Sequence, residues 1–156
     1  MSQAVTPINT YNNTQNFYPS NDKWEYKLLP FLASSAIDDG TAVARQISAN
    51  TTTGNLTKMG VENAAGADFV GILAQKIAST DSDYATAGKL RGVWVPMNET
   101  AEAYFKVGAG TFTAVDVGKT VEFHSDSKSL AVDTAGKGAR IVSYISSTKG
   151  TCVFTL

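Results

Sequence analysis

One short stretch of the chain carries the residue types of a phosphate-binding loop. Gly118-Lys119-Thr120 matches the end of the signature G-x-x-x-x-G-K-[ST], in which backbone N–H groups and a lysine hold phosphates. The signature also needs a glycine at the position of Thr113 and a helix after the loop, whereas Val121-Glu122-Phe123 has the pattern of a strand. We therefore expect no nucleotide site, and we interpret Gly118 as a turn residue that precedes a strand.

Other side chains that could do chemistry are few and scattered. His124 is the single histidine and ends a strand pattern on its polar side, and Cys152, the single cysteine, alternates with Phe154 toward an expected core. The pairs Asp38-Asp39 and Asp81-x-Asp83 lack the further ligands of a calcium loop, so we expect turn and capping roles for them. We predict no catalytic residue, no cofactor and no metal site.

The composition narrows the classes of partner. The chain has 156 residues, with 13 basic and 14 acidic side chains, so no basic field is present to hold a nucleic acid backbone. The apolar passage from Leu28 to Ile37 contains Pro30 and is too short to span a bilayer. No signal peptide pattern is visible near the start, and we expect neither a membrane partner nor secretion.

Short runs of strand length predict an all-β fold. From Phe69 onward the chain reads DFVGILAQKI, KLRGVWVP, AEAYFKV, KTVEFH, SLAVD, ARIVSYIS and TCVFTL, each closed by Gly, Asp, Asn or Ser. In AEAYFKV, the residues Ala101, Ala103, Phe105 and Val107 share one face. Short connections between these runs favour an antiparallel barrel or sandwich, with at most one helical turn in each of STDSDYATAG and TAVD.

The first residues differ in kind, and we interpret residues 1–25 as an extended N-terminal arm before a β-rich domain of residues 26–156. No charged residue occurs before Asp22, while aromatic residues recur. Low-charge disordered segments are usually poor in aromatic residues, so an arm that becomes ordered on a partner is as good an interpretation as a disordered leader. The partner-binding residues predicted on the arm and among exposed aromatics are Tyr11, Phe17, Tyr18, Trp24 and Tyr104.

A wider set of aromatic residues leaves two interpretations open. Trp24, Trp94, Tyr104 and Tyr144 could together form a stacking platform for sugars. Packing in the core or at a subunit interface is the favoured interpretation, because Trp94 has the same strand parity as Leu90.

The runs FVGILAQKI, AGKLRGVWVP and AYFKVGAGTFTAVDVGKTVEF, with their turn glycines, resemble the small head decoration, or cement, proteins of tailed bacteriophages. The resemblance covers residues from Phe69 to Leu156, slightly over half of the chain. It implies a β-rich capsid-binding domain, often a homotrimer, on the outer capsid surface of the virion, made in the host cytoplasm. The implied partner is the major capsid protein, whose contacts the decoration protein stabilises, without enzyme activity.

Two other functions remain as alternatives. A phage tail or fibre module that binds a host-surface glycan would use exposed tyrosine and tryptophan rings. A small hydrolase would need a cleft that brings His124 beside serine or aspartate side chains.

Overall fold

The computed structural model describes residues 3–4, 16–48, 51–59 and 69–155 of the chain. Two six-stranded sheets contain all of its strands, in the orders β1-β3-β5-β4-β6-β7 and β10-β9-β11-β12-β8-β2. The elements, in chain order, are β1 (Gln3–Ala4), β2 (Tyr18–Pro19), β3 (Trp24–Phe31), β4 (Ala42–Ser48), β5 (Thr51–Lys58), β6 (Phe69–Leu73), β7 (Lys89–Pro96), β8 (Glu102–Ala109), the 3-10 helix η1 (Ala114–Asp116), β9 (Thr120–Phe123), β10 (Leu130–Ala135), β11 (Ala139–Ser146) and β12 (Lys149–Phe154). The predicted all-β fold is confirmed.

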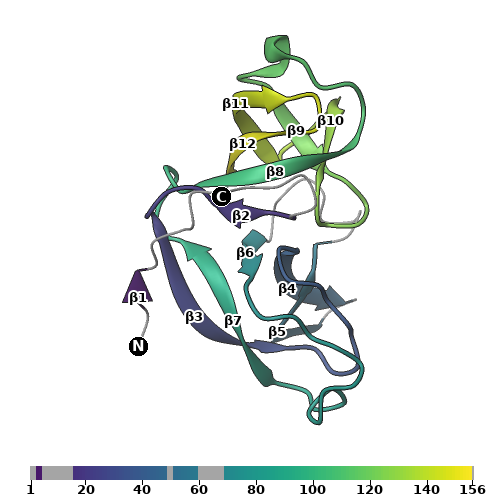
Figure 1. Ribbon diagram of the computed structural model, residues 1–156. Helices are drawn as coiled ribbons and strands as arrows, with labels where there is room; N and C mark the ends of the chain where they lie inside the picture. Colours follow the sequence, from purple (N-terminus) through teal and green to yellow (C-terminus); the bar gives the residue numbers. More distant parts are fainter. Residues whose placement is uncertain (1–2, 5–15, 49–50, 60–68, 156) are drawn as a thin grey trace.

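Each sheet closes on itself. In the first sheet β3 pairs with β7 as well as β5, which makes a closed ring of five strands, β3 to β7, named here ring 1. In the second sheet β8 pairs with β10 as well as β12, and the strands β8 to β12 are named ring 2. Figure 1 shows ring 2 above ring 1, with β2 between them. Closure removes the free sheet edges at which other chains would add.

The two rings have the same strand order. When the five strands of each ring are numbered in chain order, their order around the ring is first, third, second, fourth and fifth. The first and third strands are parallel, and the other neighbouring strands are antiparallel. A short strand also lies antiparallel to the start of each first strand, β1 beside β3 and β2 beside β8. The chain therefore folds as two copies of one topology.

The first strand and the loop that follows it have equal lengths in the two rings. The first strands both have eight residues, and the second strands begin at Ala42 and Thr120, in each case 18 residues after the first strand begins. The two loops end in the same pattern, D-x-G-x-x-V, at residues 38–43 and 116–121. Both glycines have positive φ angles, 78° at Gly40 and 94° at Gly118, a conformation that glycine adopts without a steric penalty.

Hydrogen bonds at the two glycines are equivalent. The N–H of Gly40 donates to the C=O of Leu73 (2.7 Å), and the N–H of Gly118 donates to the C=O of Ile141 (2.8 Å). The N–H of Leu73 returns a bond to Thr41, as the N–H of Ile141 does to Lys119, both at 2.9 Å. Thus β6 corresponds to β11 with a fixed register, Leu73 to Ile141.

Ring interiors are filled by alternating apolar side chains. In ring 1, Phe31, Ile37, Val43, Leu56, Leu73, Ile77 and Val93 form one buried cluster. In ring 2, the predicted inward face is confirmed, because Ala101, Ala103 and Phe105 are buried and Val107 packs against the same cluster. Cys152 is buried there as predicted.

An aromatic cluster joins the two rings. Phe154 belongs to ring 2, and Phe69 and Trp24 belong to ring 1. The aromatic centroid of Phe154 lies 4.4 Å from that of Phe69 and 6.0 Å from that of Trp24. Phe17 and Phe123 complete the cluster, with centroids 5.3 Å and 5.8 Å from Phe154. Since these side chains lie in one continuous core with the interior of ring 2, the two rings form a single body.

The predicted boundary between arm and domain is wrong. Residue 25 falls inside β3, and the described residues before it belong to the fold, because β2 pairs with β8 and the N–H of Phe17 donates to Gly40 (3.1 Å). The Asn21 side chain also bonds the C=O of Thr100 (2.9 Å). Residues 5–15 of the predicted arm lie outside the described residues.

Candidate functional site

At the Gly118-Lys119-Thr120 stretch the groups that could hold a phosphate have other partners. The Lys119 ammonium lies 2.7 Å from Asp116, whose second oxygen accepts the N–H of Thr113 (2.9 Å). The hydrogen bond from Lys119 and that from Thr113 hold the pKa of the Asp116 carboxyl below its usual value. The strand β9 follows, as predicted, and Gly118 is the predicted turn residue.

Beside Gly108 the fold brings His124 near a serine and an aspartate, which is the grouping that a hydrolase would require. A Cβ on Gly108 would lie 2.1 Å from the Ser129 hydroxyl and 2.8 Å from the His124 side chain. However, Ser129 is fully buried and its hydroxyl donates to Asp126 (2.9 Å), while no hydrogen bond joins it to His124. A nucleophile must instead be exposed and bonded to the base, so this grouping stabilises the turn between β9 and β10.

Cys152 is closed to solvent in the same way. Burial raises the pKa of its thiol well above the usual value, and the nearby charge of Glu102 adds to this shift. A thiolate is the reactive form of cysteine, so the position is that of a structural thiol.

The acidic pairs take structural roles: Asp81 has the predicted turn role, whereas Asp38 and Asp83 form ion pairs that were not predicted. Asp81 accepts the N–H of Ala78 (2.9 Å), and Arg91 bonds Asp83 at 2.6 Å and Asp81 at 3.1 Å. Asp38 bonds the Lys128 ammonium at 3.0 Å, which links ring 1 to the β9–β10 turn. Among the described residues, no group of three or more His, Cys, Asp or Glu side chains is placed to hold a metal.

Two of the predicted partner-binding aromatics are in the core. Phe17 and Trp24 are both buried, and the indole N–H of Trp24 donates to the C=O of Glu102 (2.9 Å). The prediction that they form contact points on an arm or an exposed surface is therefore wrong, because both aromatic side chains are buried in the core that joins ring 1 to ring 2. Tyr11 lies outside the described residues.

Tyr18 and Tyr104 are half-buried and face each other across the β2–β8 pairing. Tyr18 also meets Trp94 at 6.4 Å and 62°, and Tyr26 meets it at 5.5 Å and 76°. A hollow of about 250 Å³ lies beside this group, lined in part by Asn16 and Asp39. Because the rings meet edge to face, they do not form one flat platform.

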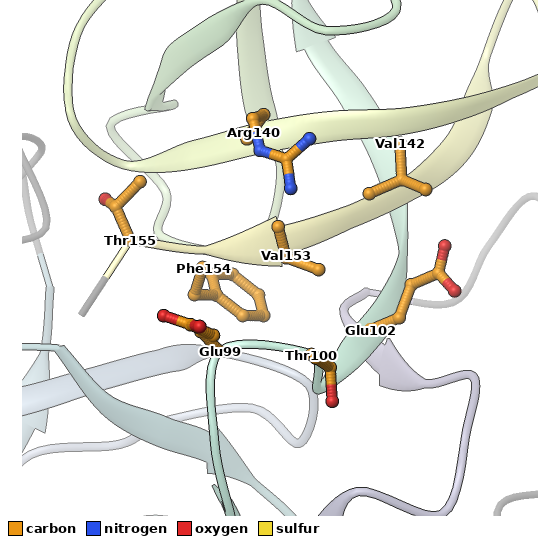
Figure 2. A pocket seen from close by; sticks show the side chains of 8 residues that line it. All are labelled: Glu99, Thr100, Glu102, Arg140, Val142, Val153, Phe154 and Thr155. Carbon is orange, nitrogen blue, oxygen red and sulfur yellow. The ribbon is translucent and has the colours of Figure 1, made fainter.

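A larger hollow, of about 600 Å³, lies on the outside of ring 2 (Figure 2). Val142 and Val153 form its apolar part, with Arg140 on one side and Glu99 and Glu102 on the other. No carboxylate of the described residues lies within ion-pair distance of Arg140, and Glu102 accepts a hydrogen bond from Thr151 (2.8 Å). Charges of both signs around a shallow apolar patch are typical of a solvated sheet face.

Four exposed apolar side chains of ring 2 were not predicted. Val115 and Val117, in and after η1, and Tyr144 and Ile145, at the end of β11, have exposed fractions of 79%, 43%, 40% and 44%. The aromatic ring of Tyr144 packs on that of the buried Phe112, with centroids 5.1 Å apart. We call these four exposed residues the tip. The sequence signal was the apolar pair Tyr144-Ile145, which breaks strict alternation in ARIVSYIS.

Comparisons with known proteins give no relative. No family model, no curated protein and no solved structure matches the chain. Within the described ranges, no helix is long and apolar enough to cross a membrane.

Proposed function

We propose that this protein is a decoration, or cement, protein that binds the outer surface of a phage head and stabilises contacts between major capsid proteins. It acts by binding and not by catalysis, as a homotrimer on the virion, without nucleic acid, membrane or cofactor. The resemblance of residues from Phe69 to Leu156 to head decoration proteins supports the proposal.

One structural observation supports the proposal most directly. The described residues that could do chemistry are used in structural bonds or buried, as at Lys119, Ser129 and Cys152, while large apolar side chains remain exposed at the tip. Exposed apolar groups on a rigid body favour association with another protein surface. A protein that binds the assembled shell and not its free subunits stabilises the shell by mass action.

Binding to phage heads that lack the protein tests the proposal. Purified protein is mixed with such heads, the heads are sedimented, and the bound protein is measured against concentration. We expect saturable binding with a fixed ratio to the major capsid protein, and a higher temperature of head disruption. Absence of both effects would contradict the proposal. The variant His124→Ala should bind like the wild type, because catalysis has no part in the function.

The alternative, a tail or fibre module that binds a glycan, is favoured by one feature. Tyr18 and Trp94 line a hollow together with the amide side chain of Asn16 and the carboxylate of Asp39, groups that bind sugar hydroxyls. Binding to a glycan array that is lost in Trp94→Ala, with no binding to heads, would favour this alternative.

A further inference from the structure

The hollow of about 250 Å³ beside Trp94, named here the Trp94 hollow, lies where four parts of the chain meet. Residues 16–18, the turn at Asp39 and Gly40, the end of β6 and Trp94 of β7 line it. Pockets that enclose a whole drug-sized molecule have volumes of about 300–1,000 Å³. The Trp94 hollow is smaller, so it suits a single chemical group of a larger partner.

Two aromatic side chains form walls of the Trp94 hollow, and a third holds them in place. Tyr18 and Trp94 meet at 62°, so the two walls stand at an angle to each other. Tyr26 packs on Trp94 (5.5 Å, 76°), and its hydroxyl occupies the space that a Cβ on Gly92 would take. This packing fixes the orientation of Trp94. Aromatic rings around a small hollow attract a cation through the negative charge of their faces.

The backbone donors around the Trp94 hollow already have partners. The N–H groups of Phe17, Gly40, Leu73 and Ala74 all donate to carbonyl groups of the fold, at 2.7–3.1 Å. The lining also has no basic side chain. Anions are held by free backbone N–H groups or by basic side chains, so the lining disfavours a phosphate or a carboxylate ligand.

Hydrogen-bond acceptors remain on two lining side chains. The Asn16 Nδ2 group donates to the backbone C=O of Asp39 (2.9 Å), which leaves the Asn16 Oδ1 atom as an acceptor. Asp39 is exposed, and no basic side chain of the described residues lies within ion-pair distance of its carboxylate. The nearby Lys76 and Lys128 pair instead with Asp38, at 3.7 Å and 3.0 Å. The hollow therefore combines an unpaired carboxylate, an amide oxygen and two aromatic walls.

We infer that the Trp94 hollow binds the guanidinium group of an arginine side chain from a partner protein. The guanidinium fork can donate two hydrogen bonds to the Asp39 carboxylate and a third to Asn16 Oδ1, while its flat face packs on an aromatic wall. A lysine ammonium has neither the fork nor the flat face. Because Lys76 and Lys128 balance the charges of the two aspartates at this turn, short contacts inside the hollow select the cation, and not a long-range field.

This inference deepens the proposed function and rests on it only for the identity of the partner, the major capsid protein. The first experiment does not use the phage head. The probe N-acetyl-arginine-methylamide is titrated into the full chain, and backbone amide and indole N–H shifts are followed by NMR. We expect saturable shifts at Asn16, Asp39 and the Trp94 indole. The citrulline analogue of the probe has nearly the same shape without the charge, and it should bind at least about tenfold more weakly. Equal binding of the two probes, or absence of shifts at the hollow, would overturn the inference.

A variant of the carboxylate tests the contact directly. Asp39→Ala should keep the Tm of the wild type, because the Asp39 carboxylate has no basic partner in the fold, and should bind the arginine probe about tenfold more weakly. Asp22→Ala is the matched control, since Asp22 is also exposed and lies outside the lining, and it should bind the probe normally. A methyl glycoside that shifts the same residues, with no response to the arginine probe, would overturn the inference and favour the glycan-binding alternative.

Phage heads that lack the protein separate the inference from the proposed function. Asp39→Ala should bind these heads about tenfold more weakly than the wild type, and Asp22→Ala should bind them normally. If the wild type does not bind heads, the proposed function fails and the probe titration alone decides the inference. If the wild type and Asp39→Ala bind heads equally well, the inference fails and the proposed function stands.

Discussion

Ring 1 and ring 2 share a strand order but present opposite outer faces. Trp24 and Ala42 of ring 1 are buried between the rings, and at the corresponding positions ring 2 has Glu102 and Thr120, which are partly exposed. The interiors differ much less, since Val43 and Val121 occupy the same position and both are buried. The comparison indicates that the apolar interior residues specify the fold of each ring, while the residues on the outer face differ according to whether that face is buried or solvated.

The comparison extends to the connections. Ring 1 has a long segment between its last two strands and an N-terminal segment across Gly40, whereas ring 2 has a two-residue hairpin connection and an open Gly118. In ring 1, the part of the outer face around Trp24 and Ala42 and the turn at Gly40 are therefore covered. Ring 2 is open at both, with a charged face and an apolar end.

The largest effect is expected where the two rings meet. Phe154→Ala should lower the free energy of unfolding by about 3–5 kcal/mol, because the side chain leaves a cavity among Phe17, Trp24, Phe69 and Phe123. Denaturation by urea, followed by tryptophan fluorescence, measures the change. Leu90→Ala, at an exposed position, should change it by no more than about 0.5 kcal/mol. A loss under about 1 kcal/mol in Phe154→Ala would show that the rings do not depend on this contact.

Equivalent positions at the ends of the rings give the next largest difference. Ile37→Ala should cost about 2–5 kcal/mol, because the side chain is buried under the segment of residues 74–88. Val115→Ala should change stability by about 0.5 kcal/mol at most, because the side chain is 79% exposed. The same urea titration measures both. Equal losses would mean that the tip is covered in solution by another part of the chain.

The two turn glycines sharpen the comparison further. Gly118→Ala should cost about 1–2 kcal/mol, the steric penalty of a side chain at positive φ. Gly40→Ala has the same penalty and also forces its Cβ against Asn16 and Phe17, which should add about 1–3 kcal/mol. Thermal unfolding of the two variants side by side checks the order. A larger loss in Gly118→Ala would contradict the equivalence of the two turns.

The sequence predicted ring 2 better than ring 1, for physical reasons. The seven predicted runs from Phe69 onward are the strands β6 to β12, and five of these, β8 to β12, make up ring 2. In β8 and β9 the alternation is clear, because one face lies on the core and the other is closer to solvent. The strands β3, β4 and β5 were not predicted. β3 does not alternate, because Trp24 and Phe31 at its two ends are buried while the apolar Leu28 is exposed, and it includes Pro30. β5, TTTGNLTK, has few apolar residues.

The candidate site was harder to predict than the fold. Strand parity predicted the buried positions of Phe105, Val121 and Cys152, because the direction of alternate side chains follows from the backbone. The exposure of Val115 depends on which distant segments of the chain cross that end of ring 2, and no local pattern contains this information. The repeat of D-x-G-x-x-V, 78 residues apart, was present in the sequence and would have indicated two equivalent rings.

The smallest expected effect concerns the segment that closes ring 1, and it depends on pH. The hydrogen bond from Arg91 is the main reason that the pKa of the Asp83 carboxyl is lowered, and the N–H of Ala78 and then Arg91 lower that of Asp81. A folded pKa below the unfolded value, about 3.9, gives stability that is present above that value and lost as the pH falls through the folded pKa. The segment should therefore loosen below about pH 4.

Asp83→Asn tests this contribution in ring 1. The variant should have a lower Tm than the wild type near neutral pH, and the two Tm values should converge below about pH 4, where the wild-type carboxyl is also neutral. Asp22→Asn is the control, because the Asp22 side chain is 72% exposed and its contact with Lys23 is long, at 3.9 Å. That variant should follow the wild-type curve throughout. Calorimetric scans over a series of pH values measure the three curves. If the curve of Asp83→Asn stays parallel to the wild-type curve, the Arg91 ion pair does not hold the segment, and packing of Ile77 and Tyr84 alone closes ring 1.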